Sequence, residues 1–237
     1  MSGSLHLENK DGSGVYVLTF KANENRFNPT FIQELHKALD TIENDRSAVA
    51  LVTTGEGKFY SNGLDLDWVS AQPDAGQAMQ TIVQEWSRLA ARFLVFPMPT
   101  VAAINGHAFA AGLMLAFAHD YRIMRDDRGF LCMPEVLIHM GLTPGMNSIV
   151  NTRINDPNTY RDAVLTGKRF GGKEAQAKGM IDLATCEDKV LPQAIALATK
   201  LSPLGKDRTT FSLLKHEMYK RPYGDLMSGK LPSKANL

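Results

Sequence analysis

Two segments of the sequence place glycines and backbone amides directly after an apolar run. Residues 105–112, rich in glycine and alanine, follow the apolar run Thr100–Ile104 and lead into the apolar residues 113–118. This order is typical of a buried strand that turns into a helix. The first amides of a helix have no internal acceptor, and the helix dipole adds positive potential there. The turn is therefore suited to hold an oxygen that carries or develops negative charge.

A second segment of the same kind lies earlier in the chain. Residues 58–66 follow the apolar run 48–53, which we interpret as a strand of the same sheet. The loops at the carboxyl ends of parallel strands lie at one edge of the sheet, where ligands bind. If the two strands are neighbours, one N–H from each loop converges on a single oxygen. Either loop alone also fits a glycine needed only for close packing, so the argument depends on the pair.

The acid in the apolar run 131–138 is Glu135. Burial among apolar neighbours disfavours a carboxylate and raises its pKa toward the range in which a general base works near neutral pH. The alternative is a glutamate at a solvent-facing turn position after Pro134, or in the first turn of a helix. The residues themselves leave both interpretations open.

Composition narrows the class of function. The 237 residues include 26 basic and 25 acidic side chains, so no basic stripe for nucleic acid is evident. Cys132 and Cys186 have no metal-ligand spacing, which predicts neither a zinc site nor a disulfide and indicates a reducing compartment. No run reaches about 18 apolar residues, so we expect a soluble protein without a membrane partner.

Strands and helices alternate along the chain, which predicts an α/β fold. Strands are expected at residues 5–7, 15–20, 48–53, 100–104, 121–124 and 180–184, and helices at 29–44, 79–93, 113–118, 160–165, 174–179 and 191–201. Asn28 is expected to precede the first of these helices, and Gly167 to end the fourth. We predict a core domain over residues 1–201 and a C-terminal helical extension and tail over 202–237.

Five motifs, in this order, resemble the crotonase superfamily of enoyl-CoA hydratases and isomerases. They are FYSNGLDL at 59–66, PTVAAINGHA at 99–108, DYRI at 120–123, MPEV at 133–136 and GLTPG at 141–145. The likeness covers roughly residues 5–201. It implies a crotonase-like spiral of ββα units with a C-terminal helical region. It also implies binding of an acyl-CoA thioester, in which coenzyme A is part of the substrate and no separate cofactor or metal is needed.

The resemblance assigns roles to particular residues. The family holds the thioester carbonyl between two backbone N–H groups, which by position are those of Leu64 and Ala111. Ala111 replaces the usual glycine but keeps its N–H. The family's hydratases use two glutamates around one water. Glu135 keeps the second, whereas Met114 occupies the position of the first, and a thioether neither takes nor gives a proton.

A single base is similar to the arrangement in Δ3,Δ2-enoyl-CoA isomerases, particularly the plant peroxisomal type. The resemblance thus implies that Glu135 moves a proton from C2 to C4 of a 3-enoyl-CoA, giving the trans-2-enoyl-CoA of unsaturated fatty acid β-oxidation. Substrate contacts are expected from Ser61, Asn62, Gly63, Asp65, Phe109, Ala110 and Met114, with Lys21 and Arg26 near the adenine and phosphates of CoA.

The residue roles, the reaction and catalysis itself each have an alternative. Lys21 and Arg26 also fit a solvated surface, and apolar residues such as Met114 also fit a plain core. Other crotonase reactions, such as thioester hydrolysis or decarboxylation, use the same oxyanion-binding amides. A non-catalytic acyl-CoA-binding protein would keep the fold without the chemistry.

The last three residues resemble a peroxisomal targeting signal. Ala235-Asn236-Leu237 keeps the small first residue and the terminal leucine of the peroxisomal Ser-Lys-Leu ending but lacks its basic middle residue. We predict a peroxisomal protein that uses the import receptor, with a cytoplasmic protein and a plain tail as the alternative. The resemblance further implies a homotrimer or hexamer.

Overall fold

A six-stranded sheet forms the centre of the computed structural model, which describes residues 4–231. The strand order is β1-β2-β3-β5-β7-β10, and all neighbours are parallel except β1 and β2. The strands are β1 (Leu5–Asn9), β2 (Val15–Phe20), β3 (Ala50–Gly55), β5 (Thr100–Ile104), β7 (Tyr121–Arg125) and β10 (Leu183–Thr185). Every residue of β3 and β5 is buried, as expected for strands covered on both faces.

A second sheet of four short strands has the order β4-β6-β8-β9. Its strands are β4 (Phe59–Ser61), β6 (His107–Phe109), β8 (Leu131–Cys132) and β9 (Arg169–Phe170). Residues 58–66 and 105–112 are predicted as loops, but they contain β4 and β6, and the second sheet is not predicted. Strands of two or three residues show no measurable alternation of apolar and polar side chains.

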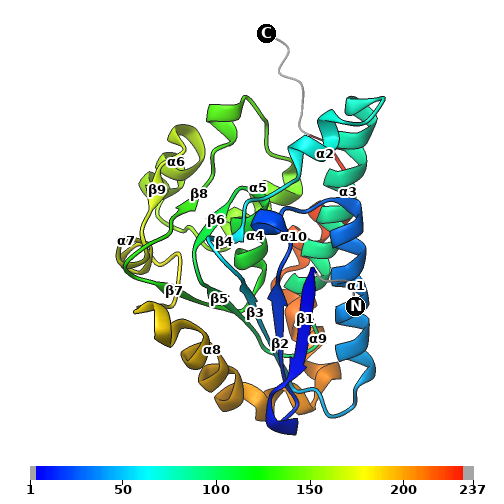
Figure 1. Cartoon of the computed structure of the whole chain (residues 1–237), viewed down its shortest axis with the longest axis vertical. Helices are drawn as coiled ribbons and strands as arrows, with labels where there is room; N and C mark the ends of the chain where they lie inside the picture. Colours follow the sequence, from blue (N-terminus) through cyan, green and yellow to red (C-terminus); the bar gives the residue numbers. More distant parts are fainter. Residues whose placement is uncertain (1–3, 232–237) are drawn as a thin grey trace.

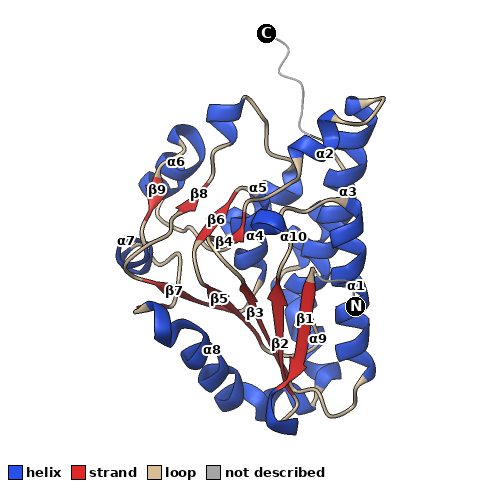
Figure 2. Cartoon of the chain, in the orientation of Figure 1, coloured by secondary structure: helices blue, strands red, loops and turns tan. Residues whose placement is uncertain are grey.

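Helices cover both faces of the large sheet (Figures 1 and 2). One face carries a large apolar core with α1 and α3, and the other is covered by α8, whose Val190, Ala194 and Ala198 pack on the strands. The helices are α1 (Pro29–Asn44), α2 (Leu66–Ser70), α3 (Ala75–Leu94), α4 (Ala111–Ala118), α5 (Pro144–Asn151), α6 (Pro157–Thr166), α7 (Gly172–Ala177), α8 (Glu187–Leu201), α9 (Arg208–Met218) and α10 (Lys220–Met227). Four 3-10 helices span Lys10–Gly12, Asn23–Asn25, Glu135–Ile138 and Ser202–Lys206.

Several helix boundaries follow from capping residues. Asn28 Oδ1 accepts a hydrogen bond from Phe31 N at 3.0 Å, which starts α1 where predicted. Gly167, at φ 63°, ends α6 as predicted. Helix α3 begins four residues before the predicted helix because Asp74 caps it. Strand β3 begins two residues after the predicted strand, because Ala48 N bonds back to Asp45 O in a turn.

The predicted C-terminal helical extension contains two helices, α9 and α10, among the described residues. Helix α10 packs against α3 and α5. Leu226 is buried, and a Cβ placed on Gly145 of α5 would lie 2.7 Å from its Cα. The extension therefore shares the main core, and the boundary between residues 201 and 202 stays a prediction. Among the described residues, no helix has the length and apolar character required to cross a membrane.

Candidate active site

The two glycine-containing loops meet beside the two sheets. Strands β3 and β5 are parallel neighbours, and β4 and β6, which follow them along the chain, are parallel neighbours too. Gly63 has a φ of 83°. A Cβ placed on it would lie 3.1 Å from Phe109 O and 3.3 Å from Ala111 N. The predicted adjacency of the two loops is therefore confirmed.

Two amides at this junction lack a protein acceptor. Leu64 N and Ala111 N donate to no residue between 4 and 231, whereas the amides of Ala110 and Asp65 are engaged. Ala110 N donates to Cys132 O at 2.9 Å, and Asp65 N donates to Phe27 O at 2.9 Å. Ala111 is the first residue of α4, so its N–H also carries the positive end of the helix dipole. This pair is suited to bind one oxygen.

Backbone contacts hold the start of α4 in place. A Cβ on Gly112 would lie 2.3 Å from Ser61 O, so only glycine allows α4 to approach β4 this closely. Ala110, which precedes the helix, has φ 50° and ψ −125°, a conformation that L-residues rarely adopt. Such strained residues persist where their surroundings over-determine them, and they cluster at functional sites.

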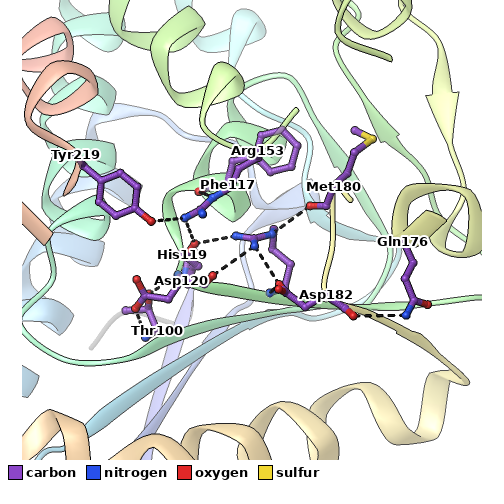
Figure 3. A network of polar contacts seen from close by, with 10 residues as sticks. Thr100, Phe117, His119, Asp120, Arg153, Gln176, Met180, Asp182 and Tyr219 are labelled. Atoms are coloured by element: carbon purple, nitrogen blue, oxygen red, sulfur yellow. Dashed lines mark hydrogen bonds and ion pairs between the residues drawn. The ribbon is translucent and has the colours of Figure 1, made fainter. Parts of the chain in front are cut away.

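Two arginines hold the other end of α4, and Figure 3 labels one of them, Arg153. Arg153 donates to Phe117 O at 2.9 Å and to His119 O at 2.7 Å, and Arg122 donates to His119 O at 2.8 Å. Burial lowers the pKa of Arg122 to about 10, so its guanidinium remains charged near neutral pH. Positive charge at a helix C-terminus complements the dipole. These contacts anchor the helix whose first amide lies at the junction.

Glu135 is buried, with 8 % of its surface exposed. Its Oε2 has no hydrogen-bond partner within the described part of the chain. Burial raises the pKa of the carboxyl from 4.5 to about 7. The exposed-turn alternative is therefore wrong, although Glu135 does begin a 3-10 helix. The following residues Val136–Ile138 are exposed, so other elements bury Glu135.

A cavity of about 510 Å³ brings these groups together. Leu64, Ala111 and Glu135 all line it, so a ligand oxygen on the two amides would share a chamber with the carboxyl. The other residues lining the cavity include Arg26, Asn62, Leu66, Asp67, Met79, Val83, Phe109, Ala110, Met114, Met140, Met146 and Leu231. Asp67, the other acid, pairs with Arg26 at 2.5 Å, which leaves Glu135 as the acid available for proton transfer.

The buried side chain of Met114 lines this cavity, at the position where the resemblance places the first glutamate of hydratases. Phe109 and Ala110 line it as well. The structure therefore brings these three predicted substrate contacts to one chamber with Leu64 and Ala111.

The predicted contacts of the first loop divide into two groups. Asn62 lines the cavity, and its Nδ2 donates to Glu24 Oε2 at 2.9 Å. Ser61 is fully buried and accepts a hydrogen bond from Gly63 N at 3.2 Å, and neither residue lines the cavity. Asp65 lies outside the lining and caps α2 by accepting a hydrogen bond from Trp68 N at 3.1 Å. These residues shape the loop that presents Leu64.

The two predicted CoA-binding cations lie apart. Arg26 lines the cavity and pairs with Glu24 and Asp67. Lys21 does not line it and pairs with Glu56 at 3.1 Å. The structure therefore brings Arg26, but not Lys21, to the site.

Neither a metal site nor a disulfide is found within the described ranges. Residues 4–231 hold no cluster of three or more His, Cys, Asp or Glu suited to a metal ion. Cys132 is buried and Cys186 is exposed, and both are free.

Much of the cavity wall consists of apolar residues that are not predicted as substrate contacts. Met79 and Val83 on α3, Met146 on α5 and Leu231 near the end of the chain line the cavity. Apolar residues of helices are expected in any core, so their types carry no signal of a ligand site.

The chain is similar to known proteins over most of its length. Residues 10–225 match the family model described as enoyl-CoA hydratase/isomerase. Enoyl-CoA delta isomerase 2, peroxisomal, of Arabidopsis thaliana is 34% identical over 212 residues, which cover 86% of this chain and 88% of that protein.

Solved structures show the same fold. A probable enoyl-CoA hydratase of Mycobacterium tuberculosis superposes with a TM-score of 0.86 at 26% identity, covering 95% of this chain and 92% of that one. Human mitochondrial delta3-delta2-enoyl-CoA isomerase superposes with a TM-score of 0.85 at 23% identity, covering 95% and 90%. The predicted α/β fold of crotonase type is thereby confirmed.

Proposed function

The chain belongs to the enoyl-CoA hydratase/isomerase family, and on that premise we propose that it is a Δ3,Δ2-enoyl-CoA isomerase with one catalytic base. The observation that carries the proposal is one cavity in which two amides and one acid, Glu135, lack partners among residues 4–231. Moving a double bond needs one base, whereas the family's hydration route needs two carboxylates, and Met114 removes one of them.

The reaction is a proton transfer between two carbons. The Glu135 carboxylate takes a proton from C2 of a 3-enoyl-CoA, and the electron pair moves into a dienolate whose oxygen accepts hydrogen bonds from Leu64 N and Ala111 N. The protonated Glu135 then returns the proton to C4, and the double bond forms between C2 and C3. Loss of one such oxyanion donor typically costs about a hundredfold or more in rate. No cofactor beyond the CoA of the substrate takes part.

The pKa of Glu135 suits this role. A base whose pKa lies near 7 is substantially ionised at neutral pH, and its conjugate acid is strong enough to return the proton. The carboxyl is buried, and its Oε2 has no hydrogen-bond partner among residues 4–231. Both properties favour a shuttle that takes up and releases one proton in each turnover.

The test follows formation of trans-2-enoyl-CoA from cis- and trans-3-hexenoyl-CoA by the wild type and Glu135→Gln. We expect the variant to lose at least a hundredfold in kcat, while the exposed control Glu56→Gln retains wild-type activity. Crotonyl-CoA should be hydrated negligibly. Thioester hydrolysis or decarboxylation would support the alternative enzymes. Binding of CoA thioesters without turnover would support the alternative of a non-catalytic binding protein.

We also propose a peroxisomal location and a homotrimer or hexamer. The name of the Arabidopsis relative supports the location, while the terminal Ala235-Asn236-Leu237 lies outside the described residues. Exposed apolar side chains on α9, Leu213, Leu214 and Met218, support self-association because burying them against another copy would remove them from water. A fluorescent fusion with and without the last three residues tests the address, and light scattering of the purified protein tests the assembly.

A further inference from the structure

The end of the described chain returns to the cavity. After α10, Gly229 has φ 62°, a left-handed conformation that glycine adopts readily. Ser228 N donates to Gly224 O at 3.0 Å, and Lys230 N donates to Ser228 Oγ at 3.3 Å. These bonds define a turn after the helix. Leu231, which follows the turn, lines the cavity.

The starting point of this segment is fixed on the apolar side of the cavity. Helix α10, whose red end emerges next to α3 in Figure 1, packs against α3 and α5. The same two helices provide Val83 and Met146 to the cavity wall. Leu226 anchors α10 because it is buried against Gly145. Leu231 follows the buried Leu226 by only five residues and joins a wall of apolar side chains.

We propose that Leu231 covers the distal part of the acyl chain and makes the site selective for longer acyl groups. The inference rests on the proposed function, in which the thioester oxygen binds Leu64 N and Ala111 N and the hydrocarbon occupies the apolar part of the same cavity. Leu231 is 43 % exposed, so its side chain has apolar surface left to bury against a ligand. A short acyl group ends before it, whereas a long one contacts it.

Point variants of the full chain test this assignment. Leu231→Ala removes the apolar contact, and Leu231→Asp adds a charge that a hydrocarbon cannot solvate. For 3-dodecenoyl-CoA we expect kcat/KM to fall by about tenfold in Leu231→Ala and further in Leu231→Asp, chiefly through KM. For 3-hexenoyl-CoA we expect less than a twofold change. A half-exposed side chain contributes little to folding, and unfolding in urea checks this.

Met227→Ala is the matched control. Met227 is 49 % exposed near the end of α10, and it does not line the cavity. This variant should leave the ratio of the two kcat/KM values unchanged. Equal losses for both substrates in the Leu231 variants, or no loss for either, would overturn the inference.

A binding measurement separates this inference from the proposed reaction. Calorimetry with saturated hexanoyl-CoA and dodecanoyl-CoA requires no turnover. We expect Leu231→Ala to raise the dissociation constant of dodecanoyl-CoA by about tenfold and that of hexanoyl-CoA by less than twofold. If the wild type binds both saturated thioesters but isomerises neither 3-hexenoyl-CoA nor 3-dodecenoyl-CoA, the isomerase proposal fails. The ratio of the two dissociation constants still tests the role of Leu231. An unchanged ratio of the two dissociation constants would refute its role.

Discussion

Replacing the buried base should stabilise the protein while it abolishes the proposed activity. The pKa of Glu135 is about 7 in the folded chain, against 4.5 for an ordinary glutamate. At about 1.4 kcal/mol for each pKa unit, ionising this carboxyl costs the folded state about 3 kcal/mol more than it costs the unfolded state. Glu135→Gln removes that cost because an amide does not ionise.

The sign depends on pH. Between pH 4.5 and 7 the folded chain holds the Glu135 proton more strongly than the unfolded chain, so the free energy of unfolding of the wild type falls as pH rises through this window. The advantage of Glu135→Gln should therefore grow from about 1 kcal/mol at pH 5 to about 3 kcal/mol at pH 8.5, apart from a pH-independent difference between amide and acid. For a chain of this length the gain of about 3 kcal/mol at pH 8.5 corresponds to a rise of roughly 6–12 °C in Tm.

Chemical unfolding of both proteins at the two pH values measures the effect. Glu24→Gln is the control because hydrogen bonds from Asn62 and Arg26 lower the pKa of Glu24. Glu24 is already largely ionised at pH 5, so its variant should differ from the wild type by nearly the same amount at both values. A pH-independent difference for Glu135→Gln would refute the assignment of a raised pKa to this carboxyl.

Three other perturbations follow from the same contacts. Ala110→Gly should raise the free energy of unfolding by about 1 kcal/mol, because strain of order 1–3 kcal/mol at φ 50° exceeds the entropy cost of glycine; a lower urea midpoint would contradict the strain. Arg153→Met should lower the free energy of unfolding by about 3 kcal/mol, because Phe117 O and His119 O lose a charged donor. An unchanged urea midpoint would show that these hydrogen bonds do not anchor α4. Met114→Glu should raise crotonyl-CoA hydration at least tenfold above the wild type, because it supplies the second carboxylate; hydration at the wild-type rate would show that position 114 does not limit this reaction.

Much of the fold follows from local signals. Strand β5 has the predicted bounds, and Asn28 and Gly167 mark helix ends where capping chemistry places them. The second sheet was not predicted because its strands are held by pairing with segments far along the chain rather than by an alternating pattern of their own. The short helices α2 and α5 were missed for a similar reason, since five or eight residues give little periodicity.

The adjacency of the two loops was easier to predict than the chamber around them. Glycines after two apolar strands indicate the loops, whereas the choice of the Leu64 and Ala111 amides comes from the family resemblance. Burial of Glu135 is one of two interpretations that its neighbours leave open. Glu135 is buried although Val136–Ile138 beside it are exposed, so other elements enclose it. The anchors of α4 escaped notice because Arg122 and Arg153 bind backbone carbonyls, which any sequence offers.

The single-base claim is tested most directly by following the transferred hydrogen. A 3-hexenoyl-CoA that carries deuterium at both C2 positions is converted by the wild type in ordinary water, and the trans-2 product is analysed by NMR. If Glu135 takes the deuteron and returns it, part of the product carries deuterium at C4. A product with hydrogen from solvent alone at C4 would contradict the direct return of the transferred proton by Glu135, because the hydrogen added to C4 would then come from solvent or from another group.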